Sequence, residues 1–199
     1  MESVFVSLNK NYSFTLKSAE EKQFVLFVES DINATLEINL AGEQARAEVI
    51  AVVLGNNNNQ INLQTKQNHL AEFTTSDLLV KSVLTGSANF NFSGLIHIAK
   101  EAQVSDAYQR NENLLLSKEA KCNSKPYLEI LANNVRCTHG ATMGRPDREQ
   151  LFYLQTRGLS AKQATKLLVD GFFNSLLAKI KDEKCLSQLK TKILAHLYD

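Results

Sequence analysis

The chain has 199 residues, 44% of them hydrophobic and 22% charged, which excludes a large multidomain enzyme, a wholly disordered chain and a fibrous repeat. Its 22 basic and 21 acidic residues leave a formal charge of +1, which argues against a nucleic-acid partner. The longest apolar run, residues 49–54, is far below the roughly 20 residues of a membrane span, and the start shows no secretory leader, so we expect a cytoplasmic protein without a membrane partner.

Residues 1–144 are dominated by short segments in which apolar and polar side chains alternate, the pattern of half-buried β-strands. In one of them, Leu36, Ile38 and Leu40 would share one face. The same interpretation predicts strands at residues 24–28, 36–40, 49–54, 61–63, 78–84, 90–92, 95–98, 127–131 and 135–142. Turn-forming residues separate them, among them the asparagines of 56–59, the Thr-Gly-Ser of 85–87 and the asparagine pair 133–134. This part of the chain is therefore predicted to be all-β.

No long amphipathic helix separates these strands, which argues against alternating β–α–β units. An all-β chain with many short strands can close as a sandwich, as a barrel or as a parallel β-solenoid, and periodicity leaves the three alternatives open. The loose return of a strand and a turn every ten or so residues is compatible with solenoid rungs of roughly 20 residues or more.

The pattern changes at residue 145, where a helical tail is predicted. Residues 147–157 should form a first helix, with Pro146 before it and Gly158 as its stop. A second helix should begin at Ser160, which with Gln163 has the spacing of a capping box. The tail holds ten basic and six acidic residues, a charge of +4, against −3 for residues 1–144. A third helix should carry an apolar stripe made of Leu186, Leu189, Ile193 and Leu197.

Motifs for a phosphate-binding loop, a dinucleotide fold, a zincin site and a hydrolase nucleophile are absent from the sequence, so this chain is not expected to bind a nucleotide. Cys137 and His139 stand out, because residues two apart on a strand point to the same side, with backbone positions about 6.6 Å apart. A thiolate and an imidazole so placed form half of a metal or iron–sulfur site, which needs about four ligands. A lone Cys and His in a strand are, however, more often packed or hydrogen-bonded core residues.

The other cysteines and histidines have no neighbour at ligand spacing, so we expect structural roles for Cys122, Cys185, His69, His97 and His196. Three cysteines are an odd number, and no Cys-x-x-Cys pair occurs among them. All three are therefore predicted to be reduced thiols.

Several runs of residues match a known family in order and in spacing. They are KPYLEI at 125–130, VRCTHGAT at 135–142, LFYL at 151–154 and RGL at 157–159. This block, residues 111–177, closely resembles the C-terminal core of the SufB/SufD family of the SUF iron–sulfur cluster assembly system, on its SufD side. The resemblance implies a right-handed parallel β-helix over residues 1–144, followed by a small α-helical C-terminal subdomain over residues 145–199 that docks a partner ATPase.

The resemblance also implies roles for single residues. In SufB-type members, a cysteine before the Leu-Leu run and a glutamate directly after the motif histidine are implicated in building the cluster, and these places hold Asn111 and Gly140 here. SufD-type members carry a Cys-x-His-Gly signature whose histidine faces the SufB partner. Cys137 and His139 occupy those positions, so they are the candidate cluster ligands at an interface between chains.

The resemblance therefore implies a non-catalytic scaffold subunit that pairs with a SufB-like chain, or with a second copy of itself, and binds a SufC-like ABC-type ATPase. An iron–sulfur cluster would be transient and shared with the partner chain, and in a homodimer two Cys137/His139 pairs would supply four ligands. The second helix is apolar on more than one side, so it is either enclosed within the protein or meets a partner. The anchors expected to meet the ATPase are Phe172, Phe173, Leu176 and Leu177.

Two other functions stay open from the sequence. The chain could be a metal-free β-solenoid interaction module in which the Cys–His strand is purely structural. It could also be an enzyme with Cys137 as nucleophile and His139 as base, which would need an orienting acid and an oxyanion hole nearby.

Overall fold

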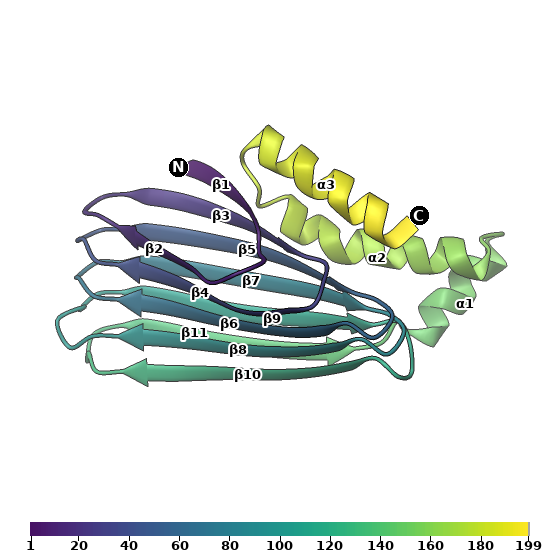
Figure 1. The fold of residues 1–199 in the computed structure, drawn as a ribbon, viewed down its shortest axis with the longest axis horizontal. Helices are drawn as coiled ribbons and strands as arrows, with labels where there is room; N and C mark the ends of the chain where they lie inside the picture. The colour runs from purple at the N-terminus through teal and green to yellow at the C-terminus, as the bar shows by residue number, and fades with distance from the viewer. Residues whose placement is uncertain (199) are drawn as a thin grey trace.

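The computed structural model describes residues 1–198, with side chains through residue 196, so the side chain of Leu197 lies outside the described residues. Within this part of the chain, eleven strands are followed by three helices (Figure 1). The strands are β1 (Glu2–Ser7), β2 (Tyr12–Leu16), β3 (Glu21–Val28), β4 (Ile32–Leu40), β5 (Arg46–Gly55), β6 (Gln60–His69), β7 (Thr75–Leu84), β8 (Asn89–Ile98), β9 (Asp106–Leu115), β10 (Lys121–Ile130) and β11 (Arg136–Gly144). The helices are α1 (Arg148–Thr156), α2 (Ala161–Leu177) and α3 (Glu183–Tyr198). The predicted strands all overlap observed ones, whereas β1, β2 and β9 have no predicted counterpart.

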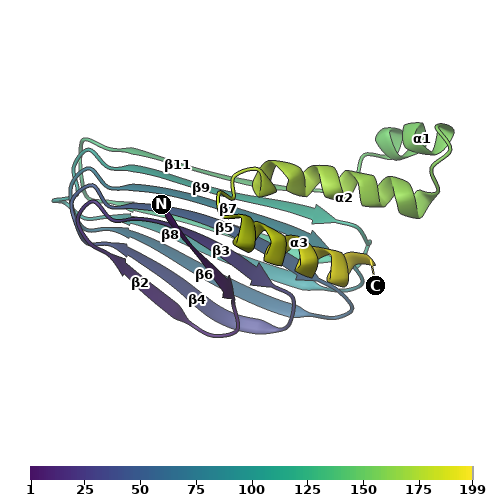
Figure 2. The ribbon, with the colours of Figure 1, turned by 90° about the horizontal axis from the view of Figure 1, so that it is seen from above.

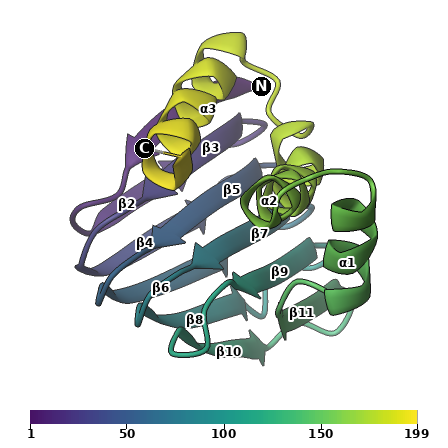
Figure 3. The same ribbon diagram turned by 90° about the vertical axis from the view of Figure 1, so that its right-hand side faces the viewer.

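Odd-numbered and even-numbered strands form two separate parallel sheets. Sheet A has the order β1-β3-β5-β7-β9-β11 and sheet B the order β2-β4-β6-β8-β10. The chain crosses between the sheets at every turn and returns beside the strand of the previous rung, since Thr75 pairs with Asp106 and Asp106 with Arg136. Seen end on, the sheets form the two walls of a flattened coil (Figure 3). The fold is a parallel β-solenoid with two strands and about 30 residues in each later rung, which confirms the predicted fold class over the sandwich and the barrel.

The two sheets differ in what covers their outer faces. The outer face of sheet B is partly exposed, so β6 and β8 alternate between buried and more exposed residues. The outer face of sheet A packs against α2 and α3, so β3 and β5 are buried along most of their length (Figures 1 and 3). Val49 and Val53 face the solenoid interior, whereas Ile50 and Val52 face the helices. The predicted alternation was therefore wrong at residues 24–28 and 49–54, where apolar side chains fill both faces.

The interior of the solenoid changes from apolar to polar along its length. The first rungs are filled by residues such as Phe24, Leu36 and Val49. Toward the last rungs many inward positions carry buried polar groups, at Thr65, Gln67, His69, Ser76, Ser82, Gln109, Asn111 and Asn113. Because three inward residues of β9 are amides, this strand lacks the apolar–polar alternation that would have predicted it.

The turns that lead from sheet B to sheet A also stack, which brings backbone close to backbone. The amide of Gln44 donates to the carbonyl of Glu72, and the amide of Phe73 donates to the carbonyl of Gln103, at 3.1 and 3.0 Å. Gln44 and Phe73 both adopt a positive φ, of 61° and 58°. In the turn that contains Gln44, the backbone of Gly42 lies directly against the turn of the preceding rung.

The helical tail begins shortly after β11. Asp147 caps α1 by accepting from the amide of Glu149 at 2.9 Å, and Ser160 and Gln163 form the predicted capping box of α2. Figures 2 and 3 show α2 and α3 side by side over sheet A, whereas α1 extends past the ends of the strands. No residue of α1 is buried, while α2 and α3 share an apolar core with sheet A. A helix with the length and hydropathy needed to cross a membrane is not found among the described residues.

Candidate functional site

The solenoid ends in two strands that each have a free edge. β10 is the last strand of sheet B and β11 the last strand of sheet A, and each pairs with one other described strand (Figure 3). The inward side chains of this last rung therefore lie at an open end of the described chain. Leu128, Ile130 and Met143 are 38%, 39% and 53% exposed there. Free strand edges beside exposed apolar side chains are typical of surfaces that pair with another chain.

Cys137 and His139 lie on β11, on the side that faces the solenoid interior. Their register partners on β9 are Ala107 and Gln109, which are fully buried, so the two side chains share one side of the strand as the spacing predicts. Cys137 packs partly buried against the small apolar cluster of the last rungs, whereas His139 is exposed. The strand thus presents an imidazole at the surface with a thiol two residues away.

The thiol of Cys137 is not activated. Burial, with a smaller contribution from the nearby carboxylate of Asp106, raises its pKa to about 11. Burial likewise raises the pKa of Cys122, on β10, to about 12. Thiols with such pKa values are protonated at neutral pH, which disfavours Cys137 as an enzymatic nucleophile. A metal ion that binds Cys137 must displace this proton.

We expect Cys137 to react slowly with N-ethylmaleimide at pH 7.5. Because its pKa is raised from 9.0 to about 11, the folded chain holds roughly a hundredfold less thiolate at this position than the unfolded chain does. Mass spectrometry of peptides gives the rate for each cysteine, with the chain unfolded in urea as reference. Modification of Cys137 at the unfolded rate would contradict this prediction and would favour the cysteine-enzyme alternative.

The remaining histidines and Cys185 have structural surroundings. His69 is buried between two hydroxyl groups, and Cys185 is buried in the core between the tail and sheet A. His97 lies 3.1 Å from a glutamate on the outer face of sheet B, and His196 lies 3.9 Å from Glu29. The structure places no group of three or more His, Cys, Asp or Glu side chains where they could hold a metal ion, within its described residues. A cluster bound at the open end would therefore need ligands from a second chain.

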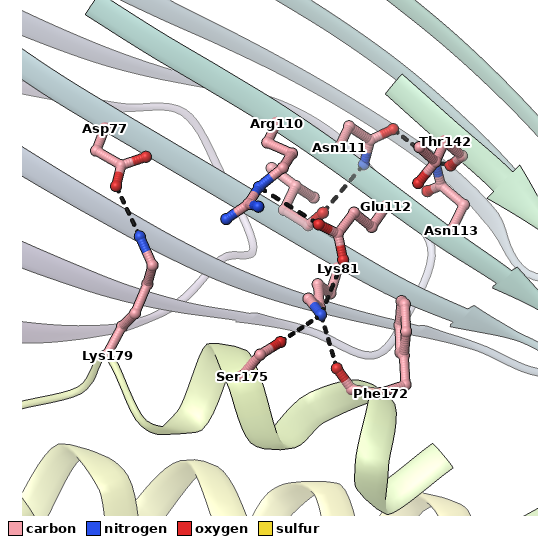
Figure 4. A network of polar contacts seen from close by, with 11 residues as sticks. Asp77, Lys81, Arg110, Asn111, Glu112, Asn113, Thr142, Phe172, Ser175 and Lys179 are labelled. Atoms are coloured by element: carbon pink, nitrogen blue, oxygen red, sulfur yellow. Dashed lines mark hydrogen bonds and ion pairs between the residues drawn. The ribbon is translucent and has the colours of Figure 1, made fainter. Parts of the chain in front are cut away.

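Asn111 and Gly140, the two positions compared with SufB-type members in the sequence, have different surroundings. Asn111 is 1% exposed inside the last rungs, where its amide donates to the carbonyl of Val80 at 3.4 Å and accepts from Asn113 at 2.7 Å (Figure 4). Gly140 faces open space, with no atom within 4 Å of where a Cβ would lie. Neither position offers a thiol or a carboxylate.

His139 also borders a polar groove that the sequence interpretation missed. The groove has a volume of about 520 Å³ and crosses the first residues of β7, β9 and β11, where Asp77, Asp106 and Arg136 line it. Arg136 pairs with Asp106 at 3.4 Å, and Asp77 pairs with Lys179 of the tail at 2.7 Å. These three charged residues stand about 30 positions apart in the sequence and meet only through the register of the strands. The rung length of about 30 residues is the one sequence signal that could have predicted their proximity.

The four expected ATPase anchors lie largely against the chain itself. Phe173 and Leu176 are 1% and 0% exposed in the core between α2 and sheet A, and Phe172 and Leu177 pack partly against the same core. The tail exposes other large apolar side chains, and sequence periodicity missed them because it does not tell which apolar side of a helix meets the sheet. They are Phe152 and Tyr153 of α1, 69% and 57% exposed, Leu167 of α2, 51% exposed, and Leu194 of α3, 51% exposed.

Comparison with known proteins places the chain in a family. Residues 6–172 match the family model described as SUF system FeS cluster assembly, SufBD core domain. The iron-sulfur cluster assembly protein SufD of Escherichia coli K12 is 33% identical over 165 residues, which cover 83% of this chain and 38% of that protein. A SufBD family protein of Synechocystis is 33% identical over 168 residues, 70% of this chain and 37% of its own length. SufB of Bacillus subtilis is 26% identical over 182 residues, which cover 88% of this chain and 39% of that protein.

The chain thus spans less than two fifths of the length of these curated relatives. Since the family model covers most of its length, the chain belongs to the SufBD core-domain family of the SUF iron–sulfur cluster assembly system.

Proposed function

We propose that this chain is a SufD-like, non-catalytic scaffold subunit for iron–sulfur cluster assembly in the cytoplasm. The observation that carries the proposal is the open end of the solenoid, where His139 is exposed on the last strand and Cys137 lies two residues away. Asn111 and Gly140 stand where SufB-type members carry a cysteine and a glutamate, which favours the SufD side. The cluster is the cargo of this site.

The free edges of β10 and β11 support pairing with a SufB-like chain or with a second copy of this chain. Edge strands carry unpaired backbone donors and acceptors that strands of a partner can satisfy. The same contact would cover the exposed side chains of Leu128, Ile130 and Met143. Cys137 and His139 would supply two ligands of a transient cluster, and the partner would supply the others.

The exposed side of the tail supports docking of a SufC-like ABC-type ATPase. Phe173 and Leu176 are already buried, so the proposal assigns the contact to Phe152 and Tyr153 of α1 and to Leu167 of α2. Large aromatic side chains on a helix that buries none of its own residues are typical anchors of protein interfaces. The ATPase would bind and hydrolyse the nucleotide, because the sequence of this chain has no nucleotide-binding motif.

Replacing His139 with alanine is expected to lower cluster formation roughly tenfold in a complex reconstituted anaerobically with SufB-like and SufC-like partners. His139 is exposed, so its loss should leave the fold and the assembly of the complex unchanged. Visible absorption together with iron and sulfide content reports the cluster, and size-exclusion chromatography reports the assembly.

His97→Ala is the matched control. His97 pairs with Glu129 of β10 on the outer face of sheet B, whereas Cys137 and His139 lie on the inward side of β11, so this variant should form clusters at the wild-type rate. Unchanged cluster formation and iron content in the His139→Ala complex would remove His139 from the mechanism.

A metal-free interaction module is the second candidate function, because the described residues hold no group of three or more potential ligands. In that case the open end would still pair with another chain. Anaerobic reconstitution of the wild-type complex would then leave neither iron nor sulfide bound, whereas the scaffold function requires both.

A further inference from the structure

A lysine is buried on the outer face of sheet A, beneath helix α2. Lys81 lies in β7 between apolar residues that face the helices, and its side chain is 5% exposed. Its ammonium group donates to the carbonyl of Phe172 at 2.7 Å and to the hydroxyl of Ser175 at 2.8 Å, both in α2 (Figure 4). It also lies 2.8 Å from the carboxylate of Glu112 in β9. These three partners match the three N–H donors of a lysine.

Stability alone does not account for this arrangement. Val52 occupies the neighbouring position on β5, and an apolar side chain at position 81 would continue the same core. Removing an ion pair from water costs free energy that the attraction between the charges only partly recovers. Two of these contacts do, however, define the position of α2, because both are satisfied at only one location of the helix along the sheet. The third partner, Glu112, lies in the same sheet as Lys81 and holds the ammonium group where it can make them.

The C-terminal end of α2 is held separately. Gln23, fully buried in β3, donates to the carbonyl of Lys179 at 2.9 Å and accepts from the amide of Lys181 at 3.3 Å, where α2 leads into α3. Lys179 also pairs with Asp77 at 2.7 Å, with both side chains about one-third exposed. Residues 179–181 therefore anchor the C-terminal end of α2, which we name the hinge end, while Lys81 holds the middle of the helix.

We propose that Lys81, held in place by its ion pair with Glu112, forms a latch that fixes α2 in one position on sheet A. When the latch opens, α2 swings about the hinge end while the solenoid stays folded. Helix α1, at the other end of α2, moves with it. The latch is a property of this chain alone and does not depend on a function in cluster assembly.

The two latch residues are not equivalent. The second carboxylate oxygen of Glu112 lies 3.3 Å from Nε of Arg110, so Glu112 keeps a cation when Lys81 is removed. Among the described residues, Glu112 is the one carboxylate paired with Lys81. Removing the charge of Glu112 therefore leaves a buried ammonium without a counter-charge. The proposal predicts that Glu112→Gln opens the latch more than Lys81→Met does.

Hydrogen exchange measured by mass spectrometry on the full chain tests the latch. In Glu112→Gln, we expect residues 161–177 to exchange roughly tenfold faster or more, with the exchange of β3 and β5 unchanged. Lys81→Met should speed the exchange of α2 by less. The double variant should exchange more slowly than Glu112→Gln alone, because it leaves no buried ammonium unpaired. Asp77→Asn is the control, since it breaks only the partly exposed pair at the hinge end and should leave the middle of α2 unchanged.

Three results would overturn the latch. They are unchanged exchange of α2 in Glu112→Gln, equal effects of the two single variants, and exchange of β3 and β5 that rises as much as that of α2. If Glu112→Gln fails to fold, Lys81→Met still tests the latch, because this substitution introduces no buried unpaired charge. In that variant, α2 must exchange faster than in the wild type while the strands do not.

Discussion

Replacing Gly42 with alanine is expected to destabilise the solenoid by roughly 3 kcal/mol or more. A Cβ at this position would lie 1.9 Å from the backbone nitrogen of Ser18 and 2.3 Å from the carbonyl carbon of Lys17. These atoms belong to the backbone of the preceding rung, so the overlap is relieved only by separating the two turns. Separation would also break the hydrogen bond from the amide of Gly42 to the carbonyl of Leu16, now 3.1 Å long.

Urea unfolding of the full chain measures this loss, and two other glycines provide matched controls. Nothing lies within 4 Å of a Cβ placed at Gly140 or at Gly171. Gly140→Ala should change stability by less than about 0.5 kcal/mol. Gly171→Ala, inside α2, should raise it by about 1 kcal/mol, because alanine has the higher helix propensity. A Gly42→Ala chain as stable as the wild type would show that the two turns do not touch in solution.

Strands were easier to predict from the sequence than sheets. Alternation located β4, because sheet B has one exposed face and Leu36, Ile38 and Leu40 point away from it. It could not choose between a solenoid, a sandwich and a barrel, since the parallel pairs join positions about 30 residues apart through backbone hydrogen bonds, which depend little on residue type. The family resemblance of residues 111–177 supplied that choice.

Prediction failed where a covering layer or a polar interior changed the pattern of a strand. Residues 24–28 and 49–54 are apolar on both faces, because α2 and α3 cover sheet A. In β9 the inward positions carry Gln109, Asn111 and Asn113, so the strand resembles a polar loop in the sequence. Both failures come from tertiary surroundings that a local pattern does not contain.

In the candidate site, too, features within one strand could be predicted and features built from several rungs could not. Cys137 and His139 could be found from the sequence, because two positions on one strand form the pair. The groove beside His139 is built from three rungs, and the partner of Lys81 follows it 31 positions later, so neither has a local signal. For the tail, residue type alone did not separate the exposed Phe152 from the buried Phe173.

His69 lies where the interior becomes polar, and its neighbours hold the ring neutral. Its Nδ1 is 2.8 Å from the hydroxyl of Thr74, and its Nε2 is 2.7 Å from the hydroxyl of Ser76. Thr74 donates its own proton to the carbonyl of Ala71, and Ser76 accepts from the amide of Gln67. These partners assign the ring proton to Nδ1, with Nε2 accepting from Ser76. A second proton, on Nε2, would break the bond from Ser76.

Acidification from pH 6.5 to pH 4 is therefore expected to lower the free energy of unfolding by roughly 3 kcal/mol through His69. Burial, with a smaller contribution from His97, lowers the pKa of His69 from 6.5 to about 4. Between these two values the unfolded chain binds a proton that the folded chain does not. The contribution of His69 to stability is thus complete above pH 6.5 and decreases as the pH falls toward 4.

Urea unfolding at pH 7 and at pH 4.5, in the wild type and in His69→Gln, isolates this contribution. Both proteins carry the same carboxylates, so the titration of those groups cancels in the difference between them. The variant should be less stable at pH 7, because hydrogen bonds to the ring are lost. On acidification, however, it should lose about 2 to 3 kcal/mol less than the wild type, since it has no imidazole to protonate on unfolding. Equal losses in the two proteins would contradict a buried, neutral His69.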